Sequence, residues 1–201
     1  MLLAYLTGAI PTSVWVGKIF FHIDIREHGS GNAGATNTMR VLGVKTGVPV
    51  LLFDIFKGWL AVKYAIILKV FETGSQEWIS LSIFLGIAAV VGHIYPVYAG
   101  FRGGKGVASI FGVLLALSPL ATLCAGGIFL ISLFISKYVS ISSMLAGISF
   151  PVWIILVFKT EFLSLKIFSI LVALLLIYTH RANIKRLVKG EENKATFLFR
   201  Q

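Results

Sequence analysis

Charged residues are scarce in this 201-residue chain. They make up 13% of it, whereas hydrophobic residues make up 57% and the mean hydropathy is +0.91. Soluble domains usually carry about 25% charged and about 45–50% apolar residues. This composition excludes an ordinary soluble globule, a disordered chain and a coiled coil.

Cysteine and proline are also rare. The single cysteine, Cys124, excludes an intramolecular disulfide framework. Five prolines beside 20 glycines fit neither collagen nor a low-complexity chain. The histidines, cysteine and glutamates do not show the spacing of a zinc site, so we expect no metal and no cofactor.

Acidic residues are the third shortage. The chain has 8 Asp and Glu against 18 Lys and Arg, which gives a formal net charge of +10. A chain this apolar has few places for charge, so the positions of its basic residues carry information about topology.

Long apolar runs, in contrast, are plentiful. A membrane-spanning helix needs about 20 mostly apolar residues to cross about 30 Å of hydrocarbon. The first run has no basic region before it and no clear small-residue cleavage site after it, so it reads as a span and not as a signal peptide. The candidate runs are residues 1–17, 46–70, 78–101, 106–136, 138–158 and 162–180.

The run 106–136 decides the number of spans. As one helix it would be about 46 Å long, which exceeds the hydrocarbon thickness. It contains Ser118-Pro119, and the residue before a proline disfavours helix. We therefore predict a short helix at about 107–117 and a longer one at about 119–136. The expected fold is all-α, a polytopic membrane protein with seven transmembrane helices, and the absence of repeats and linkers predicts one domain, 1–201.

Charge parity supports seven spans. With that number, 13 Lys and Arg fall on one face, three on the other and two inside the second span. Cytoplasmic loops carry the excess of basic residues in membrane proteins. We expect the N-terminus outside and the C-terminus in the cytoplasm.

Small polar residues dominate the first cytoplasmic segment, residues 30–40. Glycine permits left-handed backbone, so successive N–H groups can converge on an anion. Hydroxyl and amide side chains add donors, and an arginine binds phosphate bidentately. A flexible connector is the alternative, but the density of polar groups favours a binding loop. The candidates are Ser30, Gly31, Asn32, Thr36, Asn37 and Arg40.

The second segment, residues 93–106, leads directly into the predicted short helix. A helix N-terminus offers free N–H groups to an anion, and Lys105 adds a full charge. The Walker A pattern fails, because Ala99 stands where it needs glycine and Gly106 where it needs Ser or Thr. We expect an anion site without ATP or Mg²⁺, in preference to a mere glycine-rich turn. Its candidates are Gly103, Gly104, Lys105 and Gly106.

The third segment, residues 178–193, follows the last span. His180 and Asn183 are three residues apart, so they share one helix face. The basic residues Arg181, Lys185 and Lys189 form another face, which suits contact with anionic lipid headgroups.

Three ionisable residues lie within the spans. Asp54 and Lys57 are three residues apart, so mutual pairing is expected, since either one unpaired in hydrocarbon costs about 2.5–3.5 kcal/mol. An orientation of Lys57 into a site cavity is equally open. His93, near a span end, is expected to be a hydrogen-bonded structural histidine.

The three segments together resemble a known family. The runs SGNAGATNTMRVLG (30–43), GHIYPVYAGFRGGKGVA (92–108) and HRANIKRLVKGEE (180–192) are similar to the three cytoplasmic motifs of the bacterial acyl-phosphate:glycerol-3-phosphate acyltransferases, the PlsY family. The resemblance covers essentially the whole chain. It implies transfer of a fatty acyl group from acyl phosphate to the 1-hydroxyl of glycerol 3-phosphate, with lysophosphatidic acid and inorganic phosphate as products. This is the first step of phospholipid synthesis, at the cytoplasmic side of the bacterial inner membrane.

The resemblance also implies residue roles. Ser30 and Arg40 match residues needed for activity, and His180 and Asn183 match the histidine and asparagine of the third motif. Gly103, Gly104 and Gly106, with Lys105, match the loop assigned to glycerol 3-phosphate. Glu191 matches a glutamate with a mainly structural role. The expected partners are the two substrates and membrane lipids, with no nucleic acid; no oligomeric state is predicted.

The general base is open at this point. The His-x4-Asp pair of another common acyltransferase type is absent from the motifs, because only His22 has a carboxylate at that spacing, Glu27. The proton acceptor is therefore His180 or a substrate phosphate oxygen. The alternative function is a membrane transporter of an anionic, phosphate-bearing solute or lipid. Clustering of the polar motifs on one face, with few polar groups at mid-span, favours the enzyme.

Overall fold

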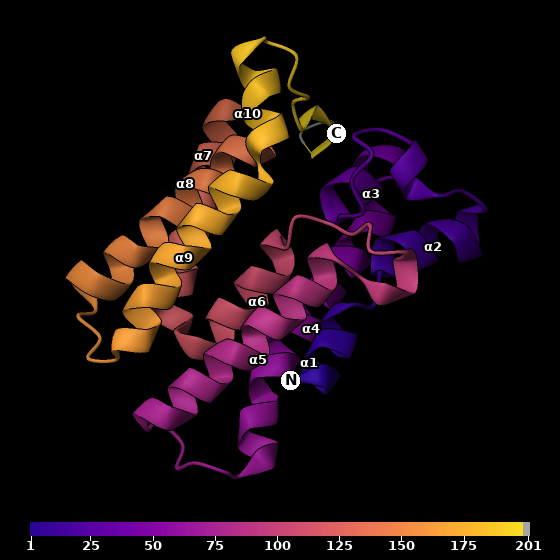
Figure 1. Ribbon diagram of the computed structural model, residues 1–201. Coiled ribbons are helices and arrows are strands. Elements are labelled where there is room, and N and C mark those ends of the chain that lie inside the picture. Colours follow the sequence, from indigo (N-terminus) through magenta and orange to yellow (C-terminus); the bar gives the residue numbers. More distant parts are fainter. Residues whose placement is uncertain (199–201) are drawn as a thin grey trace. The chain divides into compact units, whose positions relative to one another are not determined.

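The computed structural model describes residues 1–198, which form helices and irregular segments without any β-strand (Figure 1). This confirms the predicted all-α class. The chain divides into two compact units, residues 1–117 and 118–201. Each unit is described by itself.

The first unit contains the break in the predicted first span. Its helices are α1 (Leu2–Gly8), α2 (Thr12–Phe21), the 3₁₀ turn η1 (Ile25–Glu27), α3 (Ala35–Leu42), α4 (Val44–Leu68), α5 (Gln76–Ile94), the 3₁₀ turn η2 (Val97–Ala99) and α6 (Val107–Leu117). The predicted first span, residues 1–17, is not one continuous helix, because α1 and α2 meet at a 43° bend. Pro11 lacks an N–H and restricts the residue before it, which interrupts the helix at this point.

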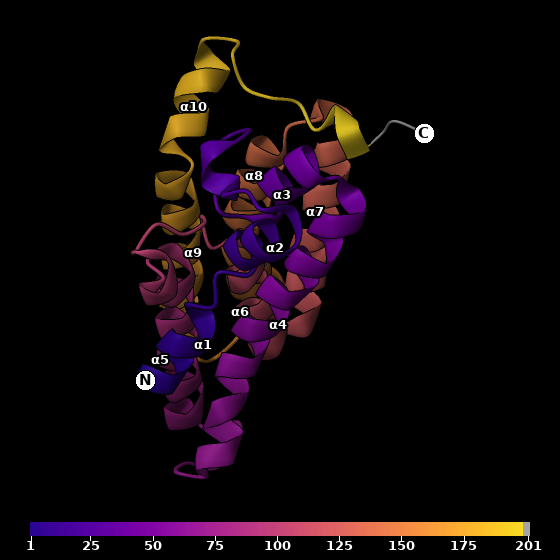
Figure 2. The ribbon, with the colours of Figure 1, turned by 90° about the vertical axis from the view of Figure 1, so that its right-hand side faces the viewer.

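Helices α4 and α6 lie side by side in the first unit (Figures 1 and 2). A Cβ at Gly58 of α4 would overlap the backbone carbonyl of Ser109, and a Cβ at Gly112 of α6 would overlap that of Ile55. Small residues of this kind allow the backbones of membrane helices to approach closely. The α4–α6 contact therefore fixes the position of the short helix and of the segment that precedes it.

The second unit is a layer of three long helices with a helical extension. They are α7 (Pro119–Ser136), α8 (Val139–Val152) with the π-helical stretch η3 (Trp153–Val157), α9 (Leu163–Thr179), α10 (Arg181–Val188) and the 3₁₀ turn η4 (Thr196–Leu198). Helix α8 packs against both α7 and α9. The bounds of α6 and α7 are those that the Ser118-Pro119 break predicts.

Length and composition alone identify fewer membrane-spanning helices than the seven predicted. Within residues 1–198, three stretches are long and apolar enough to cross a membrane: Gln76–Ala99, Pro119–Ser136 and Val139–Val157. The bent pairs α1–α2 and α9–α10 raise this number to five if each pair crosses once. Helix α4 carries Asp54, Lys57 and Lys63 along its length, and α6 has only 11 residues.

Candidate active site

The first polar segment is a short loop followed by a helix. The sequence predicts a binding loop over 30–40, but residues from Ala35 onward belong to α3. Ser30 and Gly31 are exposed, and Asn32 is half-buried. Thr36 and Arg40 are both half-buried and lie one turn apart on α3, so they share a helix face next to the loop.

Asn37 organises this loop from within. Its side-chain oxygen accepts a hydrogen bond from the Ser30 N–H at 2.8 Å, and its amide nitrogen donates to the carbonyls of Ile25 and His28, both at 3.0 Å. The side chain is buried, with 2% of the residue exposed. Both N–H groups of the amide are thus used inside the protein. Asn37 therefore holds the loop that presents Ser30, and its predicted contact with a substrate phosphate stays a prediction.

The glycine segment packs on the end of α5. The N–H of Gly103 donates to the carbonyl of Ile94, and the N–H of Gly104 donates to that of His93, each at 3.1 Å. A Cβ at Gly103 would overlap the His93 carbonyl, and one at Gly104 would overlap the His93 ring. These two glycines are needed for close approach to α5, and their backbone N–H groups are used there; the prediction that they contact a substrate phosphate stays a prediction.

The remaining part of the segment starts the short helix. Gly106 has a left-handed backbone (φ +83°), and its carbonyl accepts from the Ile110 N–H at 2.7 Å. Lys105 is half-buried beside it, and α6 begins at Val107. Free N–H groups at a helix start and an adjacent cation are the features that bind anions.

The third segment brings together the predicted histidine and asparagine in the second unit. His180 and Asn183 are both buried at the junction of α9 and α10, with 2% and 6% exposed. The Nδ1 of His180 lies 2.8 Å from the carbonyl of Leu176. A carbonyl only accepts, so Nδ1 carries the proton and Nε2 holds the lone pair of the neutral ring. This tautomer suits a base that acts through Nε2.

Glu192, and not Glu191, is the structural glutamate. Its Oε1 accepts from the Asn183 amide at 2.6 Å and from the Ser140 hydroxyl at 2.9 Å, and its Oε2 pairs with Arg186 Nε at 2.8 Å. Burial raises the pKa of Glu192, but the hydrogen bonds from Asn183, Arg186 and Ser140 outweigh it and hold the pKa below its usual range. Glu191, to which the resemblance gives a structural role, is exposed.

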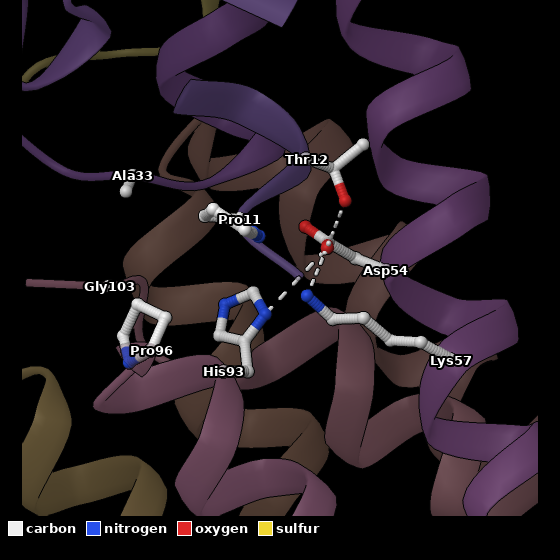
Figure 3. A pocket seen from close by; sticks show the side chains of 8 residues that line it. All are labelled: Pro11, Thr12, Ala33, Asp54, Lys57, His93, Pro96 and Gly103. Atoms are coloured by element: carbon white, nitrogen blue, oxygen red, sulfur yellow. Dashed lines mark hydrogen bonds and ion pairs between the residues drawn. The ribbon is translucent and has the colours of Figure 1, made fainter. Parts of the chain in front are cut away.

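The predicted pairing of Asp54 with Lys57 is confirmed, and both side chains are buried. Lys57 Nζ lies 2.7 Å from Asp54 Oδ1 and also donates to the Ile10 carbonyl, at the α1–α2 break, at 2.8 Å. The Thr12 hydroxyl donates to Asp54 Oδ1 at 3.3 Å. Figure 3 shows these side chains converging with His93.

His93 is a hydrogen-bonded structural histidine, as predicted. The Ser109 hydroxyl donates to the backbone carbonyl of Asp54 at 3.1 Å, and its oxygen lies 3.1 Å from His93 Nδ1. The hydroxyl hydrogen is used, so the ring N–H donates to Ser109. His93 Nδ1 is 3.7 Å from Asp54 Oδ1, which adds an electrostatic contact to the network.

A cavity of about 10 Å³ lies among these groups, close to the space that one water molecule needs (Figure 3). It is too small for a sugar phosphate or a lipid headgroup. It is lined by Pro11, Thr12, Ala33, Asp54, Lys57, His93, Pro96 and Gly103. Ala33 belongs to the first loop and Gly103 to the glycine segment, so the two candidate anion-binding segments meet over one buried ionic network. Lys57 pairs with Asp54 and also lines this cavity.

Asp24 and Arg26 are not among the residues predicted from the sequence. Arg26 Nη1 donates to the carbonyl of Ala99 at 2.7 Å and to that of Arg102 at 3.3 Å. Asp24 holds the same guanidinium, with Arg26 Nε 2.9 Å from Oδ1 and Arg26 Nη2 2.7 Å from Oδ2. Hydrogen bonds from Arg26 hold the pKa of Asp24 far below its usual range, in spite of partial burial. Nothing in the sequence indicates that Arg26 binds the carbonyl of Ala99, 73 residues away.

Comparisons with known proteins identify the family of the chain. The profile of the family described as "Glycerol-3-phosphate acyltransferase" matches residues 1–190. The glycerol-3-phosphate acyltransferase of Chlorobaculum tepidum is 45% identical over 222 residues, which cover 98% of this chain and 95% of that protein. The chain belongs to the glycerol-3-phosphate acyltransferase family.

Two solved structures of PlsY, an integral membrane glycerol 3-phosphate acyltransferase, resemble this member of the family. The glycerol 3-phosphate form has a TM-score of 0.85 and 38% identity, and it covers 96% of this chain and 92% of its own. The lysophosphatidic acid form has a TM-score of 0.83 and 36% identity, with 99% and 96% covered. The predictions of a membrane acyltransferase that acts on glycerol 3-phosphate in phospholipid synthesis are confirmed, and the transporter alternative is set aside.

Proposed function

We propose that the acyl donor of this glycerol-3-phosphate acyltransferase is an acyl phosphate, and that the reaction takes place at the cytoplasmic face of the bacterial inner membrane. The observation that carries the proposal is the meeting of two candidate anion-binding segments in the first unit. The loop that presents Ser30 and the segment that presents Lys105 are joined by Arg26 and flank one cavity. A reaction between two phosphate-bearing substrates needs two such sites close together.

The side chains available for this task are donors and cations. Arg40 can bind a phosphate bidentately, and Lys105 adds a charge at the N-terminus of α6. Ser30, Thr36 and the amide of Asn32 supply further donors, and Gly31 and Gly106 let the backbone turn toward an anion. Cations and donors of this kind also stabilise the charge that develops as the leaving phosphate departs.

The chemistry is a direct displacement. The 1-hydroxyl oxygen of glycerol 3-phosphate attacks the acyl carbon, a new C–O ester bond forms, and the bond from the acyl carbon to the phosphate oxygen breaks. Inorganic phosphate leaves with the bonding electrons. An acyl phosphate is a mixed anhydride with a good leaving group, so positioning the hydroxyl, worth about 7–11 kcal/mol at best, supplies much of the rate.

The hydroxyl proton goes to Nε2 of His180 or to a substrate phosphate oxygen. The buried His180 tautomer supports the first route, and Asn183, fixed by Glu192, accompanies it. A His180→Ala variant distinguishes them. With His180 as base, kcat falls by about 10²–10⁴-fold while KM changes little. Near-normal turnover with unchanged KM would assign the proton to the substrate phosphate.

We propose seven spans, with the N-terminus outside and the C-terminus cytoplasmic, and both compact units acting as one acyltransferase domain. The charge bias of 13 basic residues against three supports this topology, and the family profile runs through both units. Single cysteines at Lys45 and Lys69, in a Cys124→Ser background, test it. An impermeant thiol reagent added to whole cells is expected to label position 69 and not position 45; equal labelling of both contradicts this topology.

The donor is tested with purified protein in lipid and labelled glycerol 3-phosphate. With acyl phosphate we expect labelled lysophosphatidic acid and one phosphate released per ester formed. With an acyl thioester in its place we expect no product. Product from the thioester alone would refute the proposed donor while leaving the acyl acceptor intact.

A further inference from the structure

The turn before the glycine segment has an unusual backbone. Gly100 and the next residue, Phe101, both have left-handed φ angles, +63° and +59°. The left-handed region is disfavoured for residues with a side chain, and it persists only where surrounding contacts hold it. Phe101 is exposed, so its own side chain does not provide that hold.

Arg26 donates hydrogen bonds to both ends of this turn. Its Nη1 donates to the carbonyls of Ala99 and Arg102, the residues that flank the left-handed pair. The next residues after Arg102 are the glycines that pack on α5 and then Lys105 at the start of α6. These two glycines therefore connect the turn to Lys105 and the start of α6.

Arg26 is itself fixed on both sides. Asp24 binds its guanidinium through both carboxylate oxygens, and the Asp24 side chain also accepts the backbone N–H of Arg26 at 3.0 Å. The side chains of Arg26 and Asp24 are 14% and 13% exposed. Bidentate pairing leaves the planar guanidinium little freedom, so its remaining hydrogens point in one direction.

A ring contact supports the same turn from α2. Trp15 and Tyr98 have ring centroids 6.1 Å apart, which places η2 against α2 independently of the ion pair. With this contact in place, loss of the Arg26 bonds loosens the turn without removing the segment from the unit.

We propose that Arg26, held by Asp24, is a positioning residue that fixes the Gly100–Phe101 turn and thereby sets Lys105 and the start of α6 for substrate phosphate. The inference rests on the proposed function, in which that segment binds a phosphate. Arg26 does not touch the substrate in this account. Its loss therefore weakens binding of the substrate more than it slows the chemical step.

Kinetics with Arg26→Gln, Asp24→Asn and Arg26→Lys test the role. For Arg26→Gln we expect the KM for glycerol 3-phosphate or for acyl phosphate to rise about tenfold, equal to about 1.4 kcal/mol, with kcat within about threefold. Asp24→Asn keeps the arginine but loosens it, so a smaller rise in the same KM is expected. Arg26→Lys, which keeps the charge and one donor, restores part of the loss.

Lys18→Gln is the matched control. Lys18 Nζ pairs with the same carboxylate, 3.3 Å from Asp24 Oδ2, but it does not touch the turn. Its side chain is 55% exposed, so kinetics within about twofold of wild type are expected. An equal KM rise in Lys18→Gln would refute the positioning role and indicate a general effect of positive charge.

Hydrogen exchange supplies a readout that does not depend on activity. Amides within residues 97–106 are expected to exchange faster in Arg26→Gln than in wild type and in Lys18→Gln, with unchanged exchange in α4. A KM rise without faster exchange, or faster exchange without a KM rise, overturns the inference. If the wild-type protein does not use acyl phosphate, the proposed donor fails, whereas unchanged exchange in 97–106 refutes the positioning role of Arg26.

Discussion

Among single residues, Glu192 has three hydrogen-bond donors around one carboxylate. Its side chain is 7% exposed and binds Asn183, Arg186 and Ser140. Three charged or polar partners lower the cost of burying the charge and fix the amide of Asn183. Glu191, its neighbour, is exposed. The two residues form a natural matched pair for experiment.

We predict that Glu192→Gln lowers activity at least tenfold and lowers Tm, whereas Glu191→Gln leaves both near wild type. The glutamine loses the ion pair with Arg186, and its NH2 group must face either Arg186 or the donors of Ser140 and Asn183. Activity assays and thermal unfolding of both variants in one detergent measure this. Equal effects of the two substitutions would contradict the assignment.

The pH dependence of the Glu192 contribution has a defined sign. The pKa of Glu192 is lowered in the folded protein, so its stabilisation is fully present above the unfolded value of about 4.3 and is lost as pH falls through the lower folded value. The Tm difference between wild type and Glu192→Gln is therefore expected to stay constant from about pH 8 to pH 5 and to shrink below about pH 4.3. A difference that grows on acidification contradicts this.

Asn37 gives a second prediction for a single residue. Replacement by alanine removes the acceptor of the Ser30 N–H, at a cost of about 1–3 kcal/mol if that group stays buried. The carbonyls of Ile25 and His28 each lose one donor but keep the N–H groups of His28 and Gly31. We expect Asn37→Ala to lose activity with Ser30 still present, and Asn37→Asp to lose activity as well, because a carboxylate oxygen would face these two carbonyls. Titration of glycerol 3-phosphate turnover measures both. Full activity in Asn37→Ala would show that the loop is held in another way.

At the scale of elements, the packing of α4 on α6 is the contact that most directly supports the glycine segment. Gly58 and Gly112 each leave room for the backbone of the opposite helix. An added methyl group has no space there and forces the helices apart, since packed interiors do not yield easily. The position of the α6 N-terminus depends on this contact.

We predict that Gly58→Ala or Gly112→Ala lowers the free energy of unfolding by about 1–3 kcal/mol or more. Tm and activity are expected to fall with it. Gly127 of α7 is the control, because a Cβ there meets nothing within 4 Å. In a helix interior, glycine to alanine at an open position is neutral or stabilises by up to about 1 kcal/mol. Thermal unfolding of the three variants compares them. An unaffected Gly58→Ala variant would contradict the close α4–α6 contact.

Helix bounds followed the sequence where a proline lies inside a long apolar run. Ser118-Pro119 predicts the ends of α6 and α7, because proline acts on its immediate neighbours. The break between α1 and α2 at Pro11 follows the same rule. The apolar run continues on both sides of this proline, so composition alone predicts one uninterrupted helix. Pro49 within α4 does not end that helix, since its early position disturbs only the first turns. Composition locates apolar segments, whereas local backbone geometry divides them.

At the scale of the whole molecule, the family and the reaction could be predicted from three short motifs, but many of the side-chain roles could not. Asn37, Gly103 and Gly104 are expected from the motifs to touch substrate, and the structure shows that they also hold the loops in shape. Their partners lie in neighbouring segments whose positions depend on the fold. Arg26 shows the same limit, because its acceptors are 73 and 76 residues away. Motifs report which residues a site needs and leave open which ones meet the ligand.

The central claim is that the glycerol 3-phosphate hydroxyl attacks the acyl carbon of an acyl phosphate directly. Glycerol 3-phosphate labelled with ¹⁸O at the 1-hydroxyl tests it most directly, with purified protein in lipid and mass spectrometry of both products. The account predicts that the ¹⁸O stays in the ester of lysophosphatidic acid and that the released phosphate carries none. Label in the released phosphate, or no lysophosphatidic acid from acyl phosphate, would contradict it.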